Sequence, residues 1–208
     1  MLTVTRLETQ KKNPQRLNVY LDGEFAFGIS RAVAPWLAEG DQLSHQKVQD
    51  LKERDLIESA YQRALNFLSY RSRSEQEIRR NLSKHQIPEE IIPEVLDKLR
   101  QSSLVDDRAF ARNWIENRCQ FKPRGKRALS AELFQKGISR EIIDDELKGL
   151  NEDDLALQCA RGKASSYQHL DQENFQKKMF AFLNRRGFPY QIIKDTVWEI
   201  WNEIHVAS

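Results

Sequence analysis

Seven apolar positions recur three times along this chain, each time with nearly the same spacing. Hydrophobic residues make up only 39% of the sequence, yet every repeated position is apolar. The three sets are Ile78, Leu82, Ile87, Ile91, Ile92, Leu96 and Leu99; Leu129, Leu133, Ile138, Ile142, Ile143, Leu147 and Leu150; and Met179, Leu183, Phe188, Ile192, Ile193, Val197 and Ile200. A period of about 50 residues indicates a row of similar supersecondary units, because each unit needs its neighbours to cover its apolar face.

Each repeat is predicted to contain three helices. A long amphipathic helix comes first, and the second helix carries an apolar pair four residues apart, such as Ile78 and Leu82, on one face. Gly137 and Gly187 then occupy equivalent positions and suit the left-handed residue that ends a helix. Gln86 stands there in the first repeat, where a side chain is expected to add strain or the turn to differ.

The third helix of each repeat is expected to bury the remaining apolar positions. We expect Ile91, Ile142 and Ile192 to be buried at equivalent places. Pro93 is expected to kink the third helix of the first repeat, because proline removes a backbone hydrogen bond.

The first residues of the chain predict strands instead of helices. Residues 17–21 and 25–29 alternate between apolar and polar, and Asp22-Gly23 between them favours a tight hairpin turn. A third strand is expected over residues 3–8, and a short helix over residues 30–39. Ser44 is expected to cap another helix that runs toward Asp55.

The predicted fold is therefore mainly α, a tandem array of three three-helix repeats preceded by a small β-rich N-terminal subdomain. The expected boundaries are 1–56 for the head and 57–104, 105–150 and 151–208 for the three repeats.

Composition excludes several classes of protein. No apolar run approaches the roughly 20 residues of a membrane span, and residues 1–30 lack the apolar core of a signal peptide. We therefore expect a cytoplasmic protein without a membrane partner. Cys119 and Cys159 lack metal-ligand spacing, no glycine-rich phosphate loop occurs, and the four histidines are scattered among polar neighbours. Neither a metal, a cofactor nor an enzymatic activity is expected.

Basic residues gather before the second helix in the first two repeats. Residues 70–74 read Tyr-Arg-Ser-Arg-Ser and residues 121–125 read Phe-Lys-Pro-Arg-Gly, whereas the third repeat has an acidic stretch at 171–175. Cations at a helix N-terminus oppose the helix dipole, so their repetition favours phosphate binding over a merely solvated loop. The candidate binding residues are Arg71, Arg73, Arg79, Arg80, Lys122, Arg124, Lys126 and Arg127.

The order of several short motifs resembles the RecX family, bacterial regulators of the RecA recombinase. The resemblance covers residues 56–201, and the head resembles the N-terminal extension of many members. The matching stretches are Leu68-Ser69-Tyr70-Arg71-Ser72-Arg73-Ser74-Glu75, Leu104-Val105-Asp106-Asp107-Arg108-Ala109-Phe110-Ala111, Lys122-Pro123-Arg124-Gly125-Lys126-Arg127, Leu133-Phe134-Gln135-Lys136-Gly137-Ile138 and Arg185-Arg186-Gly187-Phe188. Ser72 departs from the family, which usually has proline there.

The resemblance implies tandem three-helix repeats and a non-enzymatic role in recombination, DNA repair and the SOS response. A family member is expected to bind RecA filaments, together with single- or double-stranded DNA within or beside them. It is expected to act as a monomer and mostly to inhibit the recombinase, ATPase and coprotease activities of RecA. The alternative is a stand-alone, non-specific DNA-binding protein that uses the same loops, although a net charge of +2 argues mildly against it.

Overall fold

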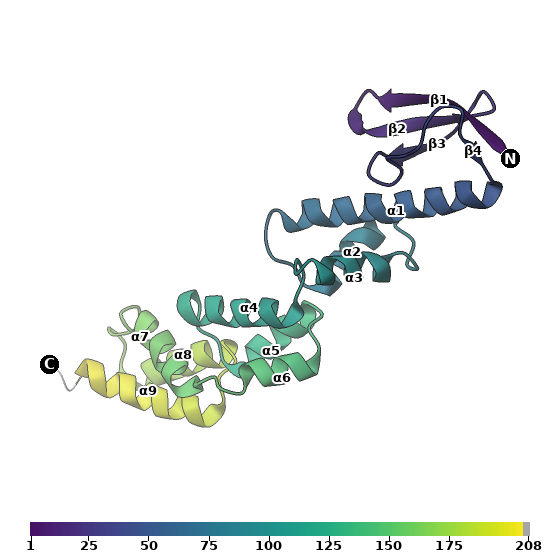
Figure 1. The fold of residues 1–208 in the computed structure, drawn as a ribbon. Helices are drawn as coiled ribbons and strands as arrows, with labels where there is room; N and C mark the ends of the chain where they lie inside the picture. Colours follow the sequence, from purple (N-terminus) through teal and green to yellow (C-terminus); the bar gives the residue numbers. More distant parts are fainter. Residues whose placement is uncertain (206–208) are drawn as a thin grey trace. The chain divides into compact units, whose positions relative to one another are not determined.

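The structure is a computed structural model that describes residues 1–205. A four-stranded sheet is followed by three groups of three helices (Figure 1). The elements are β1 (Leu2–Gln10), β2 (Asn13–Leu21), β3 (Glu24–Ser30), β4 (Gln42–Leu43), α1 (His45–Leu68), α2 (Glu75–Lys84), α3 (Ile92–Gln101), α4 (Asp107–Phe121), α5 (Lys126–Gln135), α6 (Arg140–Leu147), α7 (Glu152–Ala164), α8 (Gln172–Arg185) and α9 (Tyr190–His205). We call α1–α3 repeat 1, α4–α6 repeat 2 and α7–α9 repeat 3, and the mainly α, three-repeat fold is confirmed. Residues 206–208, which we expected to end the third repeat, lie outside the described residues.

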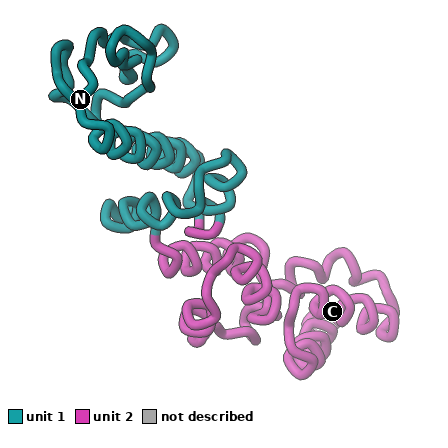
Figure 2. Tube along the Cα trace, turned by 90° about the vertical axis from the view of Figure 1, so that its right-hand side faces the viewer, with its two compact units in different colours: residues 1–73, 77–105 teal, residues 74–76, 106–208 magenta. Residues whose placement is uncertain are grey.

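The chain forms two compact units, coloured separately in Figure 2. Unit 1 comprises residues 1–73 and 77–105, and therefore holds the head and most of repeat 1. Unit 2 comprises repeats 2 and 3 together with residues 74–76, which lie at the start of α2.

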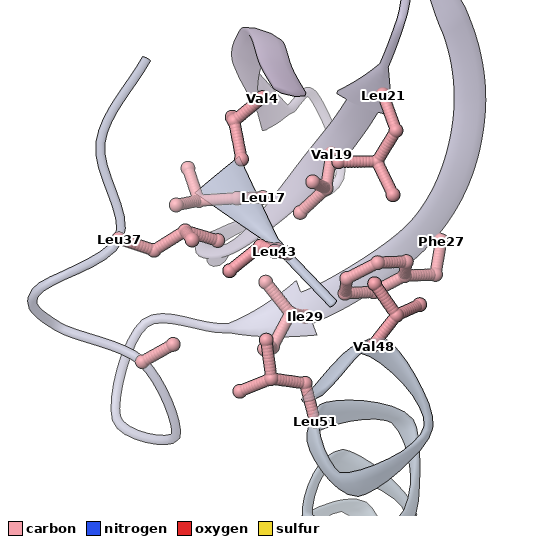
Figure 3. Packing of buried hydrophobic residues seen from close by; sticks show 11 residues of the cluster. Val4, Leu17, Val19, Leu21, Phe27, Ile29, Leu37, Leu43, Val48 and Leu51 are labelled. Carbon is pink, nitrogen blue, oxygen red and sulfur yellow. The ribbon is translucent and has the colours of Figure 1, made fainter. Parts of the chain in front are cut away.

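The head is an antiparallel sheet with strand order β3-β2-β1-β4. Val19 pairs with Phe27, and Asp22 and Gly23 both have positive φ between the paired residues Leu21 and Glu24, so the predicted hairpin turn is confirmed. The sheet buries one apolar face against the start of α1, where Val48 and Leu51 reach it (Figure 3). The remaining members of this core are Val4, Leu17, Val19, Leu21, Phe27, Ile29, Ala34, Leu37 and Leu43.

The short helix expected over residues 30–39 is wrong, because Ser30 ends β3 and residues 31–39 form turns and irregular backbone. Pro35 has no backbone N–H to donate and disfavours a helical conformation at Ala34 before it. Ala34 and Leu37 are nevertheless buried in the core of the head. Ser44 caps the next helix as predicted, accepting a hydrogen bond from the N–H of Lys47 at 3.1 Å.

Helix α1 contributes to two cores. Its first half supplies Val48 and Leu51 to the head, and its second half supplies Ile57, Ala60 and Ala64 to repeat 1. One continuous helix therefore joins the sheet to the first repeat.

Each repeat has its own apolar core, and the recurring positions form it. All recurring positions are buried except Ile87, Ile142, Leu150 and Ile192, which are partly buried at the edges of the cores. The expectation for Ile91 is thus confirmed, but that for Ile142 and Ile192 is wrong by one residue. The following residues Ile92, Ile143 and Ile193 are the equivalent members that are fully enclosed, because one residue turns a helix position by about 100°.

The expected kink at Pro93 is also absent. Helix α3 begins at Ile92, so Pro93 lies in the first turn. The N–H that proline lacks would have no partner within the helix at this position.

Two close contacts within unit 2 have the same design. Ser74 donates its hydroxyl to the carbonyl of Lys136 at 2.6 Å, and the equivalent Gly125 donates its N–H to the carbonyl of Arg186 at 3.0 Å. The residue after each of these also donates a backbone hydrogen bond to the carboxylate that begins the next repeat. The N–H of Glu75 donates to Asp107 of α4 at 2.9 Å, and the N–H of Lys126 donates to Glu152 of α7 at 2.8 Å. Ser74 and Gly125, which precede α2 and α5, are therefore buried against a neighbouring repeat.

Glycine is required in these contacts for two reasons. Gly137 and Gly187 have φ of +85° and +88°, and a Cβ on either would collide with Gln76 or Ala128. Gln86 has φ of +61° and is exposed, so the predicted strain at this turn is present.

Candidate functional site

The first basic loop, residues 70–74, joins α1 to α2 in repeat 1. Arg71 forms a two-pronged ion pair with Glu77, with nitrogen–oxygen distances of 2.9 and 3.1 Å. Arg71 also donates to the carbonyl of Ser72 at 2.8 Å. The Arg71 side chain is 43% exposed, whereas that of Glu77 is only 13% exposed. Breaking this pair would leave a largely buried carboxylate with one partner fewer, so Arg71 is held more firmly than an unpaired surface cation.

Arg73 makes no ion pair in the described structure. Its guanidinium lies over the ring of Phe67, 4.0 Å from the ring centre, and its Nε is buried without a hydrogen-bond partner. Burial, followed by the nearby charge of Arg71, lowers the pKa of Arg73 from its ordinary value. An anion close to Arg73 would offset both effects.

The two candidate arginines of α2 differ in their surroundings. Arg79 pairs with Glu89 at 3.1 Å, and Ser83 also contacts Glu89. Arg80 is exposed on the helix. All four candidates of repeat 1 lie in unit 1, but only Arg71 and Arg73 belong to the loop.

The second basic loop, residues 121–125, joins α4 to α5 in repeat 2. Arg124 pairs with Glu132 at 2.6 Å, and Arg127 donates to the backbone and side-chain oxygens of Asn184 at 3.2 and 3.3 Å. The ammonium groups of Lys122 and Lys126 have no partner among residues 1–205. The two lysines are thus the cations of this loop that are available to a ligand.

Glu132, which binds several side chains around the second loop, was not among the predicted site residues. Glu132 of α5 accepts hydrogen bonds from Trp114 at 2.7 Å and from Arg118 at 2.8 Å, besides its pair with Arg124. Arg118 and Lys136 also lie over the Trp114 ring, at 4.6 and 5.0 Å. Aligning the repeats at their common spacing places Asn81 opposite Glu132, and this difference was visible in the sequence.

The acidic stretch of the third repeat has a structural role. Asp171 caps α8 by accepting the N–H of Asn174 at 2.9 Å, and this hydrogen bond lowers the pKa of the Asp171 carboxyl. A carboxylate at a helix N-terminus is stabilised by the helix dipole. Repeat 3 thus has an ordinary helix cap where repeats 1 and 2 have basic loops.

Within residues 1–205, no group of three His, Cys, Asp or Glu side chains is placed to hold a metal ion. Burial raises the pKa of the Cys119 and Cys159 thiols, which makes the reactive thiolate scarcer at neutral pH. None of the helices within residues 1–205 is long and apolar enough to cross a membrane.

The sequence of this chain matches models of known protein domains along most of its length. The RecX N-terminal domain matches residues 2–44, and the first, second and third three-helix domains of RecX match residues 60–99, 106–147 and 151–197. A regulatory protein RecX from Clostridium botulinum (strain Alaska E43 / Type E3) is 30% identical over 211 residues, which cover 97% of this chain and 98% of that protein. The chain belongs to the RecX family.

Other RecX proteins are similar over much of their length. A regulatory protein RecX from Listeria monocytogenes (serotype 4a, strain HCC23) is 28% identical over 213 residues, covering 100% of this chain and 79% of that protein. A crystal structure of a regulatory protein RecX matches with a TM-score of 0.74 at 30% identity, covering 94% of this chain and 100% of the other. The crystal structure of RecX from Lactobacillus salivarius matches with a TM-score of 0.63 at 29% identity, covering 70% and 97% of the two chains.

Proposed function

We propose that this protein binds RecA filaments on DNA and restrains the recombinase, ATPase and coprotease activities of RecA. It would act as a cytoplasmic monomer and catalyse no reaction itself. Membership of the RecX family, whose members carry the name regulatory protein, is the observation that carries this proposal. The repeats would be the functional modules, with the boundaries 57–104, 105–150 and 151–208.

The basic loops support a contact with DNA phosphate or with acidic protein surface. Cations recur at equivalent places in repeats 1 and 2, although Ser74 and Gly125, which precede α2 and α5, are buried by contacts in unit 2. The proposed contacts are made by Arg71, Arg73, Arg79, Arg80, Lys122, Arg124, Lys126 and Arg127. Among these, Lys122 and Lys126 bind a ligand without first leaving an internal partner.

The proposal is tested by measuring RecA ATPase activity on single-stranded DNA while this protein is added at far below one copy per RecA. We expect inhibition in this range, because a protein acting on a filament affects many subunits at once. Inhibition that appears only when the protein saturates the DNA would favour the alternative, a stand-alone DNA-binding protein that competes for the same strand. No inhibition at any ratio would contradict both.

A further inference from the structure

Unit 1 contains an open cleft of about 720 Å³ between strands β2 and β3 and helices α1 and α2. This volume lies within the range of roughly 300–1,000 Å³ that is common for ligand sites. Its wall is rich in amide side chains and includes one basic and two aromatic side chains from the end of α1 and the loop after it. The lining residues that matter below are Arg63, Asn66, Phe67, Tyr70 and Asn81.

The equivalent region of repeat 2 carries a carboxylate that repeat 1 does not have at the same position. There, Glu132 neutralises Arg124 at 2.6 Å and also binds Trp114 and Arg118. The equivalent residues of repeat 1 are Asn81 for Glu132, Arg73 for Arg124 and Arg63 for Trp114. Repeat 1 thus replaces the carboxylate by a neutral amide and the indole by a second cation.

Arg63 and Arg73 consequently have no bound carboxylate among the described residues. The charge of Glu77 acts on Arg73, but Glu77 is already paired with Arg71. Arg73 is stacked on Phe67 and makes no ion pair, and the exposed Arg63 has no partner within the described residues. Glu58 is the one carboxylate among the residues lining the cleft, and it accepts a hydrogen bond from Gln62 at 2.9 Å. An anionic ligand would supply the charge that Glu132 supplies in repeat 2.

An exposed aromatic ring stands at the rim of the same cleft. The side chain of Tyr70 is 84% exposed, and Phe121, at the equivalent position of the second loop, is 66% exposed. Exposed aromatic rings beside cations bind single-stranded nucleic acid, because an unpaired base stacks on the ring while the cations contact the backbone. The bases of a duplex are already stacked on each other, so they do not reach such a ring.

We propose that this cleft binds unpaired nucleotides of single-stranded DNA. A base stacks on Tyr70, its edge meets the amides of Asn66 and Asn81, and the phosphate lies toward Arg63 and Arg73. This inference rests on the proposed function only in taking DNA as a partner, and it specifies the strand state and the site.

The test uses the full chain alone, without RecA, and a fluorescein-labelled oligothymidine whose binding is followed by anisotropy. We expect Tyr70→Ala to weaken binding about tenfold, because stacking of one base contributes on the order of a tenfold change or more in affinity. The dependence of affinity on salt should stay unchanged, since no phosphate contact is lost. Arg63→Ala should instead reduce the salt slope by about one.

Three further variants separate the site from general surface effects. Tyr70→Phe keeps the ring and should bind like the wild type. Asn81→Glu restores the carboxylate of repeat 2, so it should weaken oligothymidine binding several-fold while the protein still folds. Trp198→Ala removes a ring that is 66% exposed on α9 and should change nothing.

Photo-cross-linking to a bromodeoxyuridine-substituted oligonucleotide gives an independent readout, and the cross-linked peptide should contain Tyr70. Equal affinity of the wild type for duplex and single strand, or wild-type binding by Tyr70→Ala, would overturn the inference. So would loss of RecA inhibition in Tyr70→Ala with unchanged oligothymidine binding, because the ring would then contact protein. If the wild type binds oligothymidine as described but fails to inhibit RecA, the cleft stands and the proposed function fails.

Discussion

At the scale of single residues, the contacts in unit 2 depend on glycines, whose lack of a side chain lets two backbone segments approach closely. Gly125 and Gly187 approach so closely that a Cβ on Gly125 would overlap the carbonyl oxygen of Gly187. Gly137 occupies the turn of repeat 2 that is equivalent to the turn of Gly187 in repeat 3. The equivalent residue of repeat 1, Gln86, has a positive φ and an exposed side chain. The same position therefore tolerates a side chain only where nothing packs against it.

We expect Gly125→Ala to lower the free energy of unfolding of unit 2 by about 1–3 kcal/mol, the usual cost of forcing atoms into a filled site. Urea denaturation measures this change. Gly149→Ala is the matched control, because a Cβ there meets nothing within 4 Å, and its effect should stay within about 0.5 kcal/mol. Equal stability of the two variants would show that the Gly125 contact is loose.

The register of the third helices gives a second residue-scale prediction. Ile143 is 1% exposed whereas Ile142 is partly buried. Ile143→Ala should cost about 2–5 kcal/mol in the free energy of unfolding, the range for truncating an enclosed side chain. Ile142→Ala in the same assay should cost clearly less. The reverse order would mean that the helix is turned by one residue.

At the scale of elements, charged groups join the first helix of repeat 2 to the third. Glu146 of α6 accepts from Arg108 at 3.1 Å and from Arg112 at 3.1 and 3.3 Å, both on α4. The hydrogen bond from Arg112, which outweighs desolvation, holds the pKa of the Glu146 carboxyl below its ordinary value. The network complements the apolar core beneath it.

This pKa predicts how stability depends on pH. A carboxyl whose pKa is lowered by folding stabilises the protein above its unfolded pKa of about 4.3, and this contribution is lost as the pH falls through the folded pKa. Glu146→Gln should therefore lose less stability than the wild type when denaturation is repeated at progressively lower pH. Glu53→Gln changes an exposed carboxyl of α1 that forms no ion pair with any described residue, and it should follow the wild type. Identical pH profiles for all three proteins would contradict the assignment.

Much of the element scale could be predicted from the sequence, because its signals are local. The apolar period placed the repeats, and Asp22-Gly23 placed the hairpin. Two predictions were wrong because they depend on the exact position of a residue within a helix. Pro93 lies in the first turn, where it causes no kink, and Ile142 lies one residue from the enclosed face.

The candidate site was harder to predict than the fold. The sequence identified the basic loops, but the partners of their cations come from other helices, as Glu132 and Asn184 show. The cleft beside Tyr70 is lined by residues of β2, β3, α1 and α2, and no short sequence motif indicates that these four elements meet. Composition and spacing identify which cations recur, and only the fold shows which of them are already paired.

At the scale of the whole molecule, a repeated helical scaffold carries two basic loops and, in repeat 3, one acidic stretch at the equivalent place. The charged contacts divide the loop residues into two groups. Arg71, Arg79 and Arg124 are paired with Glu77, Glu89 and Glu132. Lys122 and Lys126 have no such pair within residues 1–205. The lysines are the better probes, because replacing Arg124 would also leave Glu132 with one partner fewer.

We propose that the basic loops act on RecA–DNA filaments. The most direct test measures how well the double variant Lys122→Gln/Lys126→Gln inhibits the RecA ATPase. Lys178→Gln/Lys194→Gln removes the same charge from exposed positions of repeat 3 and serves as the control. We predict that the loop variant inhibits several-fold less well, with a salt slope flatter by about two if both lysines contact phosphate, while the control matches the wild type. Equal inhibition and equal salt slopes for all three proteins would contradict the claim.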